Sequence, residues 1–469
     1  MRLKALCLLA VCSVFLPSLA MTAHRGKAVS LWLTTENRAL LLAKQPEALH
    51  FQKQGAQLPV IEVNDAHKYQ SMDGFGFALT GGSAQLLMRM DASQRGDLLR
   101  ELFGTGDGQI GVSYLRVSVG SSDMNDHAFT YDDLPAGETD LSLAKFDLGP
   151  DSTTVIPVLK EILAINPSIQ VLGSPWSAPA WMKTNDNLKG GKLKPEYYAT
   201  YAEYFVKYIQ AMRAQGIRID AITIQNEPLN PNNTPSMVME AEEQTAFIKN
   251  ALGPAFHKSN IKTKIIIYDH NCDRPDYPIT ILNDPEARQF VDGSAFHLYE
   301  GEMSALTKVH DAYPNKNVYF TEQMTVDRKG DPNLEIAQAV SRLIVAAPRN
   351  WSRNVLLWNL AADPSFGPHT NNGGCPVCEG AITLDGEAVT RNIAYYTVAQ
   401  ASKFVRPGSV RIESNSLEQL PNVAFAAPGG KRVLIVANTG SAAQSFQIRY
   451  HGKAVATSLK SGAVGTYVW

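Results

Sequence analysis

Hydrophobic and polar positions change their pattern near residue 70. Before this point, residues 24–66 are mixed and polar, and they contain short β-like runs such as Val29–Leu33 and Leu58–Val63 without a long helical period. After it, short apolar runs rich in β-branched residues alternate with stretches whose apolar residues recur at helical spacing. Strands that alternate with helices in this way are typical of βα units around a parallel sheet.

The runs after residue 70 that have the length and composition of buried strands are Gly74–Leu79, Ser113–Val119, Ile169–Ser174, Ala221–Gln225, Lys264–Asp269, Gly293–His297, Val318–Thr321 and Asn354–Leu357. The stretch Pro195–Gln215 between two of them has aromatic residues at i, i+3, i+4 spacing, which predicts a helix packed on the sheet. Strands in this number favour a closed (β/α)₈ barrel over an open doubly wound sheet. The chain also lacks the Gly-x-Gly-x-x-Gly turn of a dinucleotide-binding sheet.

The last part of the chain changes pattern again. After a helix expected at Ile393–Phe404, the Pro407-Gly408 turn marks a boundary. The strand-like runs that follow are Val410–Glu413, Val423–Ala426, Arg432–Asn438, Ser445–Tyr450 and Thr466–Trp469. We therefore predict an α/β barrel over residues 67–404 and an antiparallel β-sandwich over residues 405–469, which the N-terminal segment 24–66 joins.

The first twenty residues have the pattern of a secretory signal. Arg2 and Lys4 form a short basic region, and the apolar stretch Ala5–Phe15 follows. Small residues then precede a cleavage site expected after Ala20, with Ala23 as the alternative. The apolar stretch is shorter than the ~20 residues that a membrane-spanning helix needs. We expect a signal peptide over residues 1–20, no transmembrane segment, and export to the periplasm or the extracellular space.

Composition limits the range of partners. The chain has 469 residues, 45% of them hydrophobic, which is enough for one large domain and a smaller one. Lys and Arg total 43 against 45 Asp and Glu, so the formal net charge is −2. A nearly neutral chain has no general attraction for nucleic acid or an anionic membrane. An uncharged substrate is favoured, and no pattern in the chain indicates an oligomeric state.

Three cysteines lie outside the predicted signal. Cys375-Pro-Val-Cys378 is expected to close a local disulfide in an oxidising compartment, whereas half a metal site and a redox pair are the alternatives. A structural zinc site needs four ligands, and two thiols alone are a weak signal for one. We expect no metal, no cofactor, and a buried free thiol at Cys272.

Two glutamates stand at the ends of predicted barrel strands. Ala221–Gln225 leads into Asn226-Glu227-Pro228, and Val318–Thr321 leads into Glu322. Active sites of (β/α)₈ barrels lie at the carboxyl ends of the strands, so the two side chains are expected to converge. A lone strand-end glutamate is more often an ion-pair partner or a helix cap, but a converging pair is what glycoside hydrolysis requires. A separation of about 5–5.5 Å would predict retention of configuration, and one of roughly 6.5–9.5 Å inversion.

Several longer motifs resemble those of glycoside hydrolase family 30, the group that includes lysosomal acid β-glucosidase (glucosylceramidase). The resemblance runs from about Asp73 to Lys403 and continues loosely into the β domain. Its motifs, in chain order, are Asp73–Thr80, Leu115–Asp123, Ser174–Asn185, Asn226–Pro228, Phe296–Tyr299, Phe320–Glu322 and Leu357–Ala361.

The resemblance implies a (β/α)₈ barrel with an attached β-sandwich and a retaining mechanism through a covalent glycosyl-enzyme. Glu227 matches the acid/base of the family and Glu322 its nucleophile. Asn226 matches a side chain that binds the 2-hydroxyl of the sugar. The residues that match the lining of the glucose subsite are Asp123, Trp176 and Trp358, and Tyr299 matches a tyrosine beside the nucleophile. Arg116 lies on the second strand and would hold the nucleophile ionised. His297 is either a supporting residue behind the site or a histidine of the core.

One loop departs from the animal lysosomal enzyme. Gly367–Cys378 follows the eighth strand, at the rim where the aglycone lies, and therefore bears on specificity. We predict a β-glucoside substrate, glycolipid or glucan, with a glucosylceramide-like compound as the main expectation. β-1,6-Glucanase and β-xylosidase or β-fucosidase activities of the same family are the alternatives.

Two other classes of protein are disfavoured by the sequence. A non-catalytic carbohydrate-binding barrel is disfavoured by the presence of both Glu227 and Glu322. A metal-dependent hydrolase would have to use His270, Cys272, His297 and the Cys375/Cys378 pair, but the chain has no H-x-x-x-H or comparable ligand spacing to support it.

Overall fold

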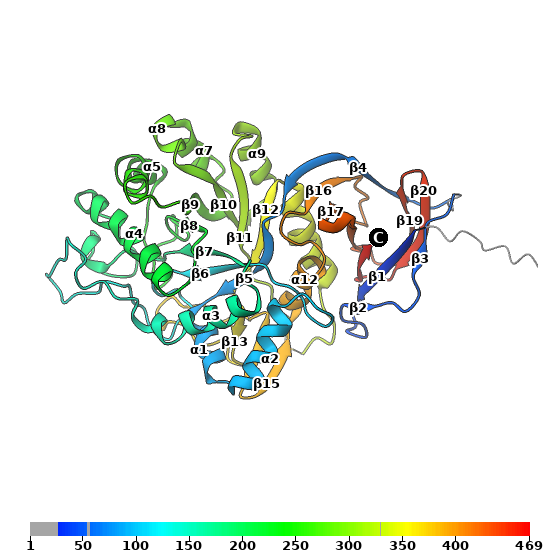
Figure 1. The fold of residues 1–469 in the computed structure, drawn as a ribbon, viewed down its shortest axis with the longest axis horizontal. Coiled ribbons are helices and arrows are strands. Elements are labelled where there is room, and N and C mark those ends of the chain that lie inside the picture. Colours follow the sequence, from blue (N-terminus) through cyan, green and yellow to red (C-terminus); the bar gives the residue numbers. More distant parts are fainter. Residues whose placement is uncertain (1–26, 54–56, 329) are drawn as a thin grey trace, which may run out of the picture.

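The computed structural model describes residues 27–53, 57–328 and 330–469. The predicted signal peptide over residues 1–20 lies outside the described residues. Two parts stand side by side in Figure 1: a barrel surrounded by helices on the left, and a β domain whose strands come from both ends of the chain on the right.

The barrel is closed by eight parallel strands in the order β10-β11-β12-β5-β6-β7-β8-β9. Their bounds are β5 Gly74–Leu79, β6 Tyr114–Ser118, β7 Gln170–Ser174, β8 Ala221–Thr223, β9 Lys264–Cys272, β10 Val291–Gly301, β11 Asn317–Glu322 and β12 Ser352–Leu357. Each of the strand runs expected after residue 70 contributes one of them. The predicted (β/α)₈ barrel is therefore confirmed.

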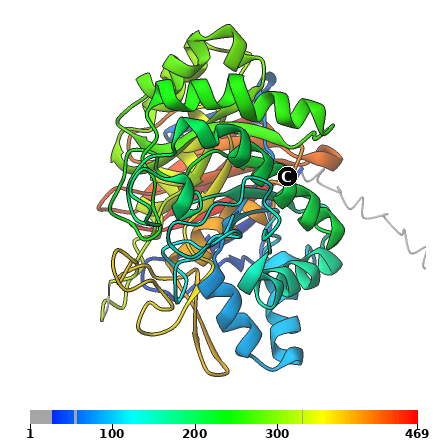
Figure 2. The same cartoon turned by 90° about the vertical axis from the view of Figure 1, so that its left-hand side faces the viewer.

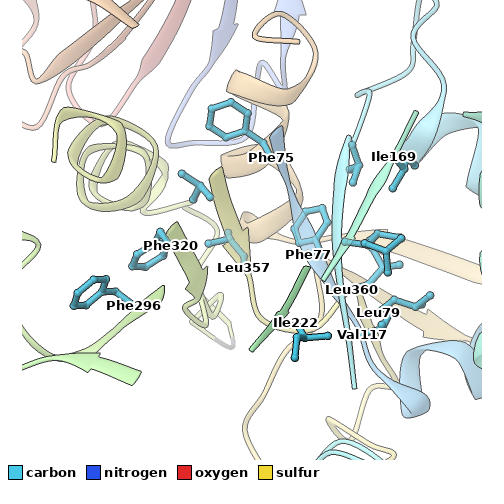
Figure 3. Close-up of a cluster of buried hydrophobic side chains, with 14 of the residues drawn as sticks. Phe75, Phe77, Leu79, Val117, Ile169, Ile222, Phe296, Phe320, Leu357 and Leu360 are labelled. Atoms are coloured by element: carbon cyan, nitrogen blue, oxygen red, sulfur yellow. The ribbon is translucent and has the colours of Figure 1, made fainter. Parts of the chain in front are cut away.

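Successive side chains of the barrel strands point alternately inward and outward, and this produces two apolar layers. Inward positions form a small cluster inside the barrel, made of Tyr114, Leu172, Ala221, Ile266, Ala295, Tyr319 and Leu356. β5 contributes no side chain to this cluster. At its Gly76 a Cβ atom would lie 1.8 Å from the carbonyl oxygen of Tyr114, so only glycine fits. Outward positions such as Phe77, Phe296 and Phe320 belong to the larger core under the helices, as Figure 3 shows. The barrel interior is a packed core, and ligands must bind at its ends.

Helices cover the outside of the barrel (Figure 2). Their bounds are α1 Gly81–Arg89, α2 Ala92–Phe103, α3 Val155–Ile165, α4 Tyr198–Ala214, α5 Ala241–Phe247, α6 Gly253–Lys258, α7 Asp276–Asn283, α8 Pro285–Arg288, α9 Ser304–Ala312, α10 Ile336–Ala339, α11 Ala346–Arg349 and α12 Ile393–Ser402. The aromatic stripe of α4 is buried at Tyr201, Tyr204 and Tyr208, as its spacing predicts. In the described part of the chain, none of the helices combines the length and apolarity needed to cross a membrane.

The β domain is a ten-stranded sheet with the main order β2-β1-β21-β18-β17-β16-β4-β19-β20, and β3 pairs with β1. The N-terminal strands are β1 Ala28–Thr34, β2 Ala43–Lys44, β3 Leu49–His50 and β4 Val60–Ser71. The C-terminal strands are β16 Val410–Ser414, β17 Asn422–Ala426, β18 Arg432–Ala437, β19 Gln444–Tyr450, β20 Lys453–Leu459 and β21 Val464–Val468. β4 extends past the predicted domain boundary at residue 66, because its part from Val63 to Ser71 pairs with β16.

β20 was not expected from the sequence. Lys453–Leu459 contains small and polar residues, so its apolar alternation is weak. It pairs with β19 through a tight turn in which His451 and Gly452 both have positive φ, at 50° and 71°. Such a turn matches the twist of an antiparallel hairpin.

The β domain and the barrel share a core. On β17 and β18, Ala424 and Leu434 face the interior of the β domain. Their neighbours Val423, Phe425 and Ile435 belong to the main core of the barrel. A sheet that is apolar on both faces is buried on both, so the two parts pack as one body.

A further small sheet lies after the last barrel strand. β13 Ala361–Ala362, β14 Ile382–Asp385 and β15 Ala388–Arg391 form it, and the long segment between β13 and β14 crosses the carboxyl end of the barrel near Asp123 and Thr234. The sequence did not predict this sheet, because β13 has only two residues and the hairpin β14–β15 is half polar.

Candidate active site

The predicted site residues gather at the carboxyl end of the barrel. Those that line one pocket of about 670 Å³ are Asp123, Trp176, Asn226, Glu227, Tyr299, Glu322 and Trp358. Each of these residues lies in the last part of a barrel strand or in the loop that follows it. The strands concerned are β6, β7, β8, β10, β11 and β12. Arg116 on β6 and His297 on β10 are fully buried behind this lining.

Glu227 and Glu322 face each other across the pocket. One carboxylate oxygen of each, together with a ring nitrogen of His297, forms a trio whose atoms all lie within 4.8 Å of one another. The nearest carboxylate oxygens are thus closer together than the carboxyl groups of inverting glycosidases, which lie roughly 6.5–9.5 Å apart to leave room for a water molecule. The geometry therefore belongs with carboxylate pairs that retain configuration.

Glu227 stands on a strained turn. Its φ is +45°, and its backbone N–H donates to the carbonyl of Asp269 at 3.0 Å, which ties the end of β8 to β9. Its Oε2 accepts from Asn230 Nδ2 at 2.8 Å and from Asn233 Nδ2 at 3.2 Å. Backbone strain of this kind is concentrated at functional sites.

Glu322 is held from two sides. Arg116 Nη1 donates to its Oε2 at 2.5 Å, and the Tyr299 hydroxyl donates to its Oε1 at 3.0 Å. Burial raises the pKa of Glu322 above its ordinary value, against the opposing charges of His297 and Arg116. Tyr299 itself stands at the rim and is 40% exposed.

Arg116 and Asp269 form the hub beneath the pocket. Arg116 Nη2 donates to Asp269 Oδ2 at 2.8 Å and to Asn226 Oδ1 at 2.7 Å. Because the amide oxygen of Asn226 is occupied in this way, its NH₂ group remains as a donor. Burial opposes the charge of Asp269, but Arg116 and His297 hold the pKa of that carboxyl well below its usual range.

His297 joins the two carboxylates to this hub. Its Nε2 lies 3.1 Å from Asp269 Oδ1 and its Nδ1 lies 3.3 Å from Glu227 Oε1. Burial lowers the pKa of His297, but the carboxylates of Glu322, Asp269 and Glu227 outweigh burial and raise it to about 9. In turn, burial raises the pKa of Glu227, but the hydrogen bond and charge of His297 bring it down to about 2. These opposite pKa shifts favour the proton on the imidazole in the ligand-free site.

Asp123 offers an unused acceptor. Its Oδ1 is buried without a hydrogen-bond partner, and burial together with the charges of Glu322 and Glu227 raises its pKa well above the usual range. Trp176 and Trp358 pack beside it with ring centroids 5.4 Å apart. A carboxyl oxygen and indole faces are suited to the hydroxyls and the C–H face of a sugar.

The cysteines take the expected states. Cys375 and Cys378 form a disulfide, and Cys272 is a buried free thiol. The trio of Glu227, His297 and Glu322 has the spacing to hold a metal ion. A metal would need a neutral imidazole, however, and the raised pKa of His297 opposes this.

Sequence reasoning missed Asp269 and the two asparagines that bind Glu227. Asp269 accepts from Ser174 and Thr223 at 2.7 Å each and from Thr321 at 2.6 Å, so side chains from several strands converge on it. The one available signal was an acidic residue at the end of the expected strand Lys264–Asp269. Asn230 and Asn233 lie in an irregular loop, where no periodicity indicates which side chain points inward.

Comparison with known proteins assigns the family. A sequence model of the glycosyl hydrolase family 30 TIM-barrel domain matches residues 72–405, and one of the family 30 β-sandwich domain matches residues 408–467. An endo-1,6-β-D-glucanase of Neurospora crassa is 36% identical over 81% of this chain and 81% of that protein, and one of Aspergillus fumigatus is 35% identical over 82% and 81%. A lysosomal acid glucosylceramidase of Mus musculus is 28% identical over 87% and 83%.

A solved structure agrees with these relatives. An endo-β1,6-glucanase superposes with a TM-score of 0.87 at 34% identity, covering 94% of this chain and 99% of that one. The similarity spans both the barrel and the β domain, so it concerns the whole described fold. The chain therefore belongs to glycoside hydrolase family 30 and is a glycoside hydrolase.

Proposed function

We propose that this protein is a retaining endo-β-1,6-glucanase. The observation that carries the proposal is the identity of 34–36% with endo-1,6-β-glucanases, against 28% with the lysosomal glucosylceramidase. The comparisons thus favour the predicted alternative over the main expectation of a glucosylceramide-like substrate. An uncharged glucan is also consistent with the formal net charge of −2.

Glu322 is assigned as the nucleophile. Its carboxylate attacks the anomeric carbon of the glucosyl unit, and the bond from that carbon to the leaving O6 breaks as the ester bond to Glu322 forms. Arg116 at 2.5 Å and the Tyr299 hydroxyl at 3.0 Å favour the ionised form that this step requires. A water molecule then attacks the same carbon, releasing Glu322 and restoring the original configuration.

Glu227 is assigned as the acid/base. It gives a proton to the leaving O6 in the first step and takes one from the attacking water in the second. The opposite pKa shifts of His297 and Glu227 favour this proton on His297 Nδ1 in the ligand-free site, 3.3 Å from Glu227 Oε1. We infer that it passes to Glu227 when the sugar displaces water from the pocket, because a buried carboxylate beside a bound neutral ligand loses its hydration.

The remaining pocket residues are assigned to the glucosyl unit that is cleaved. The free NH₂ of Asn226 is available for its 2-hydroxyl, and the unpartnered Oδ1 of Asp123 for another hydroxyl. Trp176 and Trp358 would cover its C–H face. Arg116 and His297 act from behind, by fixing the carboxylates.

We also propose that the protein acts in the periplasm or the extracellular space. A polymer such as a β-1,6-glucan is met outside the cytoplasm, and disulfides persist in oxidising compartments. The predicted signal over residues 1–20 supports the same location. Sequencing the amino terminus of the secreted protein would test this, since a chain that still begins at Met1 contradicts it.

A substrate panel tests the proposed activity. Purified protein is incubated with a linear β-1,6-glucan, glucosylceramide in detergent, and aryl β-glucoside, β-xyloside and β-fucoside. We expect the glucan to release oligosaccharides of several lengths at early times. Proton NMR should show that the β-anomer forms first. Faster turnover of glucosylceramide than of the glucan would contradict the substrate, and glucose alone at early times would contradict endo action.

A chelator in the same assay tests the expected absence of a metal. Turnover should be unchanged by EDTA, because every proposed step uses side chains of this chain. Loss of turnover that is restored by a divalent cation would instead assign the Glu227, His297 and Glu322 trio to a metal.

A further inference from the structure

A long irregular segment borders the pocket and has no role in the mechanism above. Residues 363–381 connect β13 to β14 without forming a helix or a strand. Within it, Gly373, Gly374, Cys375 and Cys378 line the pocket. Long loops without regular structure in a compact domain are typical of binding elements. We call residues 370–378 the disulfide loop.

The disulfide loop is bonded to the loop that carries the partners of Glu227. Thr234 N–H donates to the carbonyl of Gly373 at 3.2 Å, and the Thr370 hydroxyl donates to the carbonyl of Thr234 at 2.7 Å. Lys189 Nζ donates to the carbonyl of Asn372 at 3.2 Å and to its side-chain oxygen at 3.1 Å. The two loops therefore form one continuous wall.

This wall lies on the side of the pocket where the leaving group must be. Asn230 and Asn233, which donate to Glu227, belong to the same loop as Thr234. The group that departs in the first step takes its proton from Glu227, so its O6 must lie next to that carboxyl. The part of the glucan beyond the scissile bond then passes along the disulfide loop.

The disulfide closes the other end of the loop. Cys375 and Cys378 are joined, and both pack against the cluster that contains Trp176, Trp358 and Met324. The Thr370 N–H also donates to the carbonyl of Asp123 at 2.8 Å. The loop is thus fixed between the sugar-facing tryptophans and the loop of Glu227.

Two glycines make the wall a backbone surface. A Cβ atom at Gly373, whose φ is +104°, would lie 2.4 Å from the carbonyl oxygen of Asn232. A Cβ atom at Gly374 would lie 2.1 Å from the carbonyl oxygen of Thr370. Without side chains, this part of the wall offers peptide groups to the pocket. Peptide N–H and C=O groups are suited to fixing the orientation of a hydroxyl-rich ligand.

We propose that the disulfide loop is the specificity determinant for the glucan beyond the scissile bond, and that the Cys375–Cys378 disulfide holds it in the binding conformation. This inference rests on the proposed function. The loop positions the leaving glucosyl unit against Glu227. An activated aryl leaving group does not depend on this positioning.

The test compares two substrates in the double variant Cys375→Ser/Cys378→Ser. Active sites are first counted with a 2-fluoro-glucoside that labels Glu322, so that misfolded protein is excluded. We expect kcat/KM for the β-1,6-glucan to fall about tenfold, because the loop must now be ordered on binding. For an aryl β-glucoside with a good leaving group we expect a change within about twofold.

Two glycine variants provide a second test, in case the double variant folds poorly, and a matched control for it. Gly373→Ala should reproduce the selective loss, because it pushes the disulfide loop away from Asn232. Gly386→Ala lies in the β14–β15 turn, where φ is also positive, at +58°, but nothing lies within 4 Å of the added Cβ atom. This variant should leave the ratio of the two substrates unchanged.

The outcomes separate the inference from the function it rests on. Equal losses on glucan and aryl glucoside, or no loss on either, would overturn the role of the disulfide loop. Wild-type protein that labels at Glu322 and cleaves aryl glucoside but not the glucan would instead overturn the proposed substrate.

Discussion

The two ends of the barrel both hold ionisable side chains, but the surroundings of these side chains differ. At the amino end, Asp73 receives two bonds from Arg353, at 2.6 and 3.2 Å, and the Tyr319 hydroxyl donates to Asp292 at 2.6 Å. Lys264 lies about equally far from Asp73 and Asp292, at 4.0 and 3.9 Å. These groups are paired: Asp73 and Tyr319 are buried, and the side chains of Arg353, Lys264 and Asp292 are partly exposed.

At the carboxyl end, buried polar groups are satisfied less well by hydrogen bonds. Asp123 Oδ1 and Arg116 Nε lack hydrogen-bond partners, and Glu227 and Asp269 have positive φ values of 45° and 66°. Unpaired buried groups and strained backbone reduce stability. The difference indicates that the amino end is built for stability, whereas the carboxyl end keeps unmet bonding capacity for a ligand.

The strongest test of this contrast is removal of the proposed nucleophile. Glu322→Gln should lower kcat by about 10⁴-fold or more on every substrate, because no ester can form. Labelling by a 2-fluoro-glucoside, followed by mass spectrometry of the peptides, should also disappear. Label that still attaches to the variant would remove Glu322 from the nucleophile role.

Removal of the proposed acid should have a smaller and selective effect. Glu227→Ala is expected to lower turnover of the glucan by about 10²–10⁴-fold, because its alkoxide is a poor leaving group. Activated aryl glucosides should be affected less, and azide should restore their turnover as the glycosyl azide. The same loss on both substrates, without rescue, would show that Glu227 is not the acid.

A matched pair of aspartates compares the two ends directly. Asp123→Asn should lower kcat/KM about 10- to 100-fold, yet it should keep or raise the free energy of unfolding, because an unpaired buried carboxyl is removed. Asp73→Asn should lower the free energy of unfolding by about 1–3 kcal/mol with little change in kcat/KM. Denaturant unfolding and steady-state kinetics measure both quantities, and the reverse pattern would refute the contrast.

The smallest expected effect is a change in the pH profile. In wild type, kcat/KM should fall at low pH as Glu322 gains a proton, and at high pH as the proton shared by His297 and Glu227 is lost near pH 9. In His297→Gln the cation that lowers the pKa of Glu227 is gone, so Glu227 must carry the proton itself. The high-pH limb should then move to lower pH, because a carboxylic acid ionises well below 9.

A stability measurement supplies the control for this profile. His297 has a higher pKa in the folded protein than its unfolded value of 6.5. Its charge therefore stabilises the fold fully below pH 6.5, and this contribution is lost as the pH rises through 9. The pH dependence should be weaker in His297→Gln. An unshifted limb and an unchanged stability profile would mean that His297 is neutral in the native protein.

Local patterns were sufficient for most of the fold. Gly74–Leu79 is a strand in both the prediction and the structure, and the ends of the other expected barrel strands differ by a few residues. Prediction was weaker where an element depends on its partner. β20 is a strand because β19 pairs with it, and β13 because β14 does. Neither has an apolar alternation of its own.

The sequence by itself determined the order of the elements and the positions of Glu227 and Glu322 at strand ends, because the side-chain period of a strand and the boundaries of a run are local properties. Only the tertiary structure decided how far apart the carboxylates are, where the shared proton lies, and that Asp269 is the hub beneath them. Those features depend on the closure and register of the barrel, which pairs His297 with Glu322 and brings Arg116 to both Asp269 and Glu322. Electrostatic interactions across such contacts vary with distance and burial, and neither quantity can be derived from the spacing of residues along the chain.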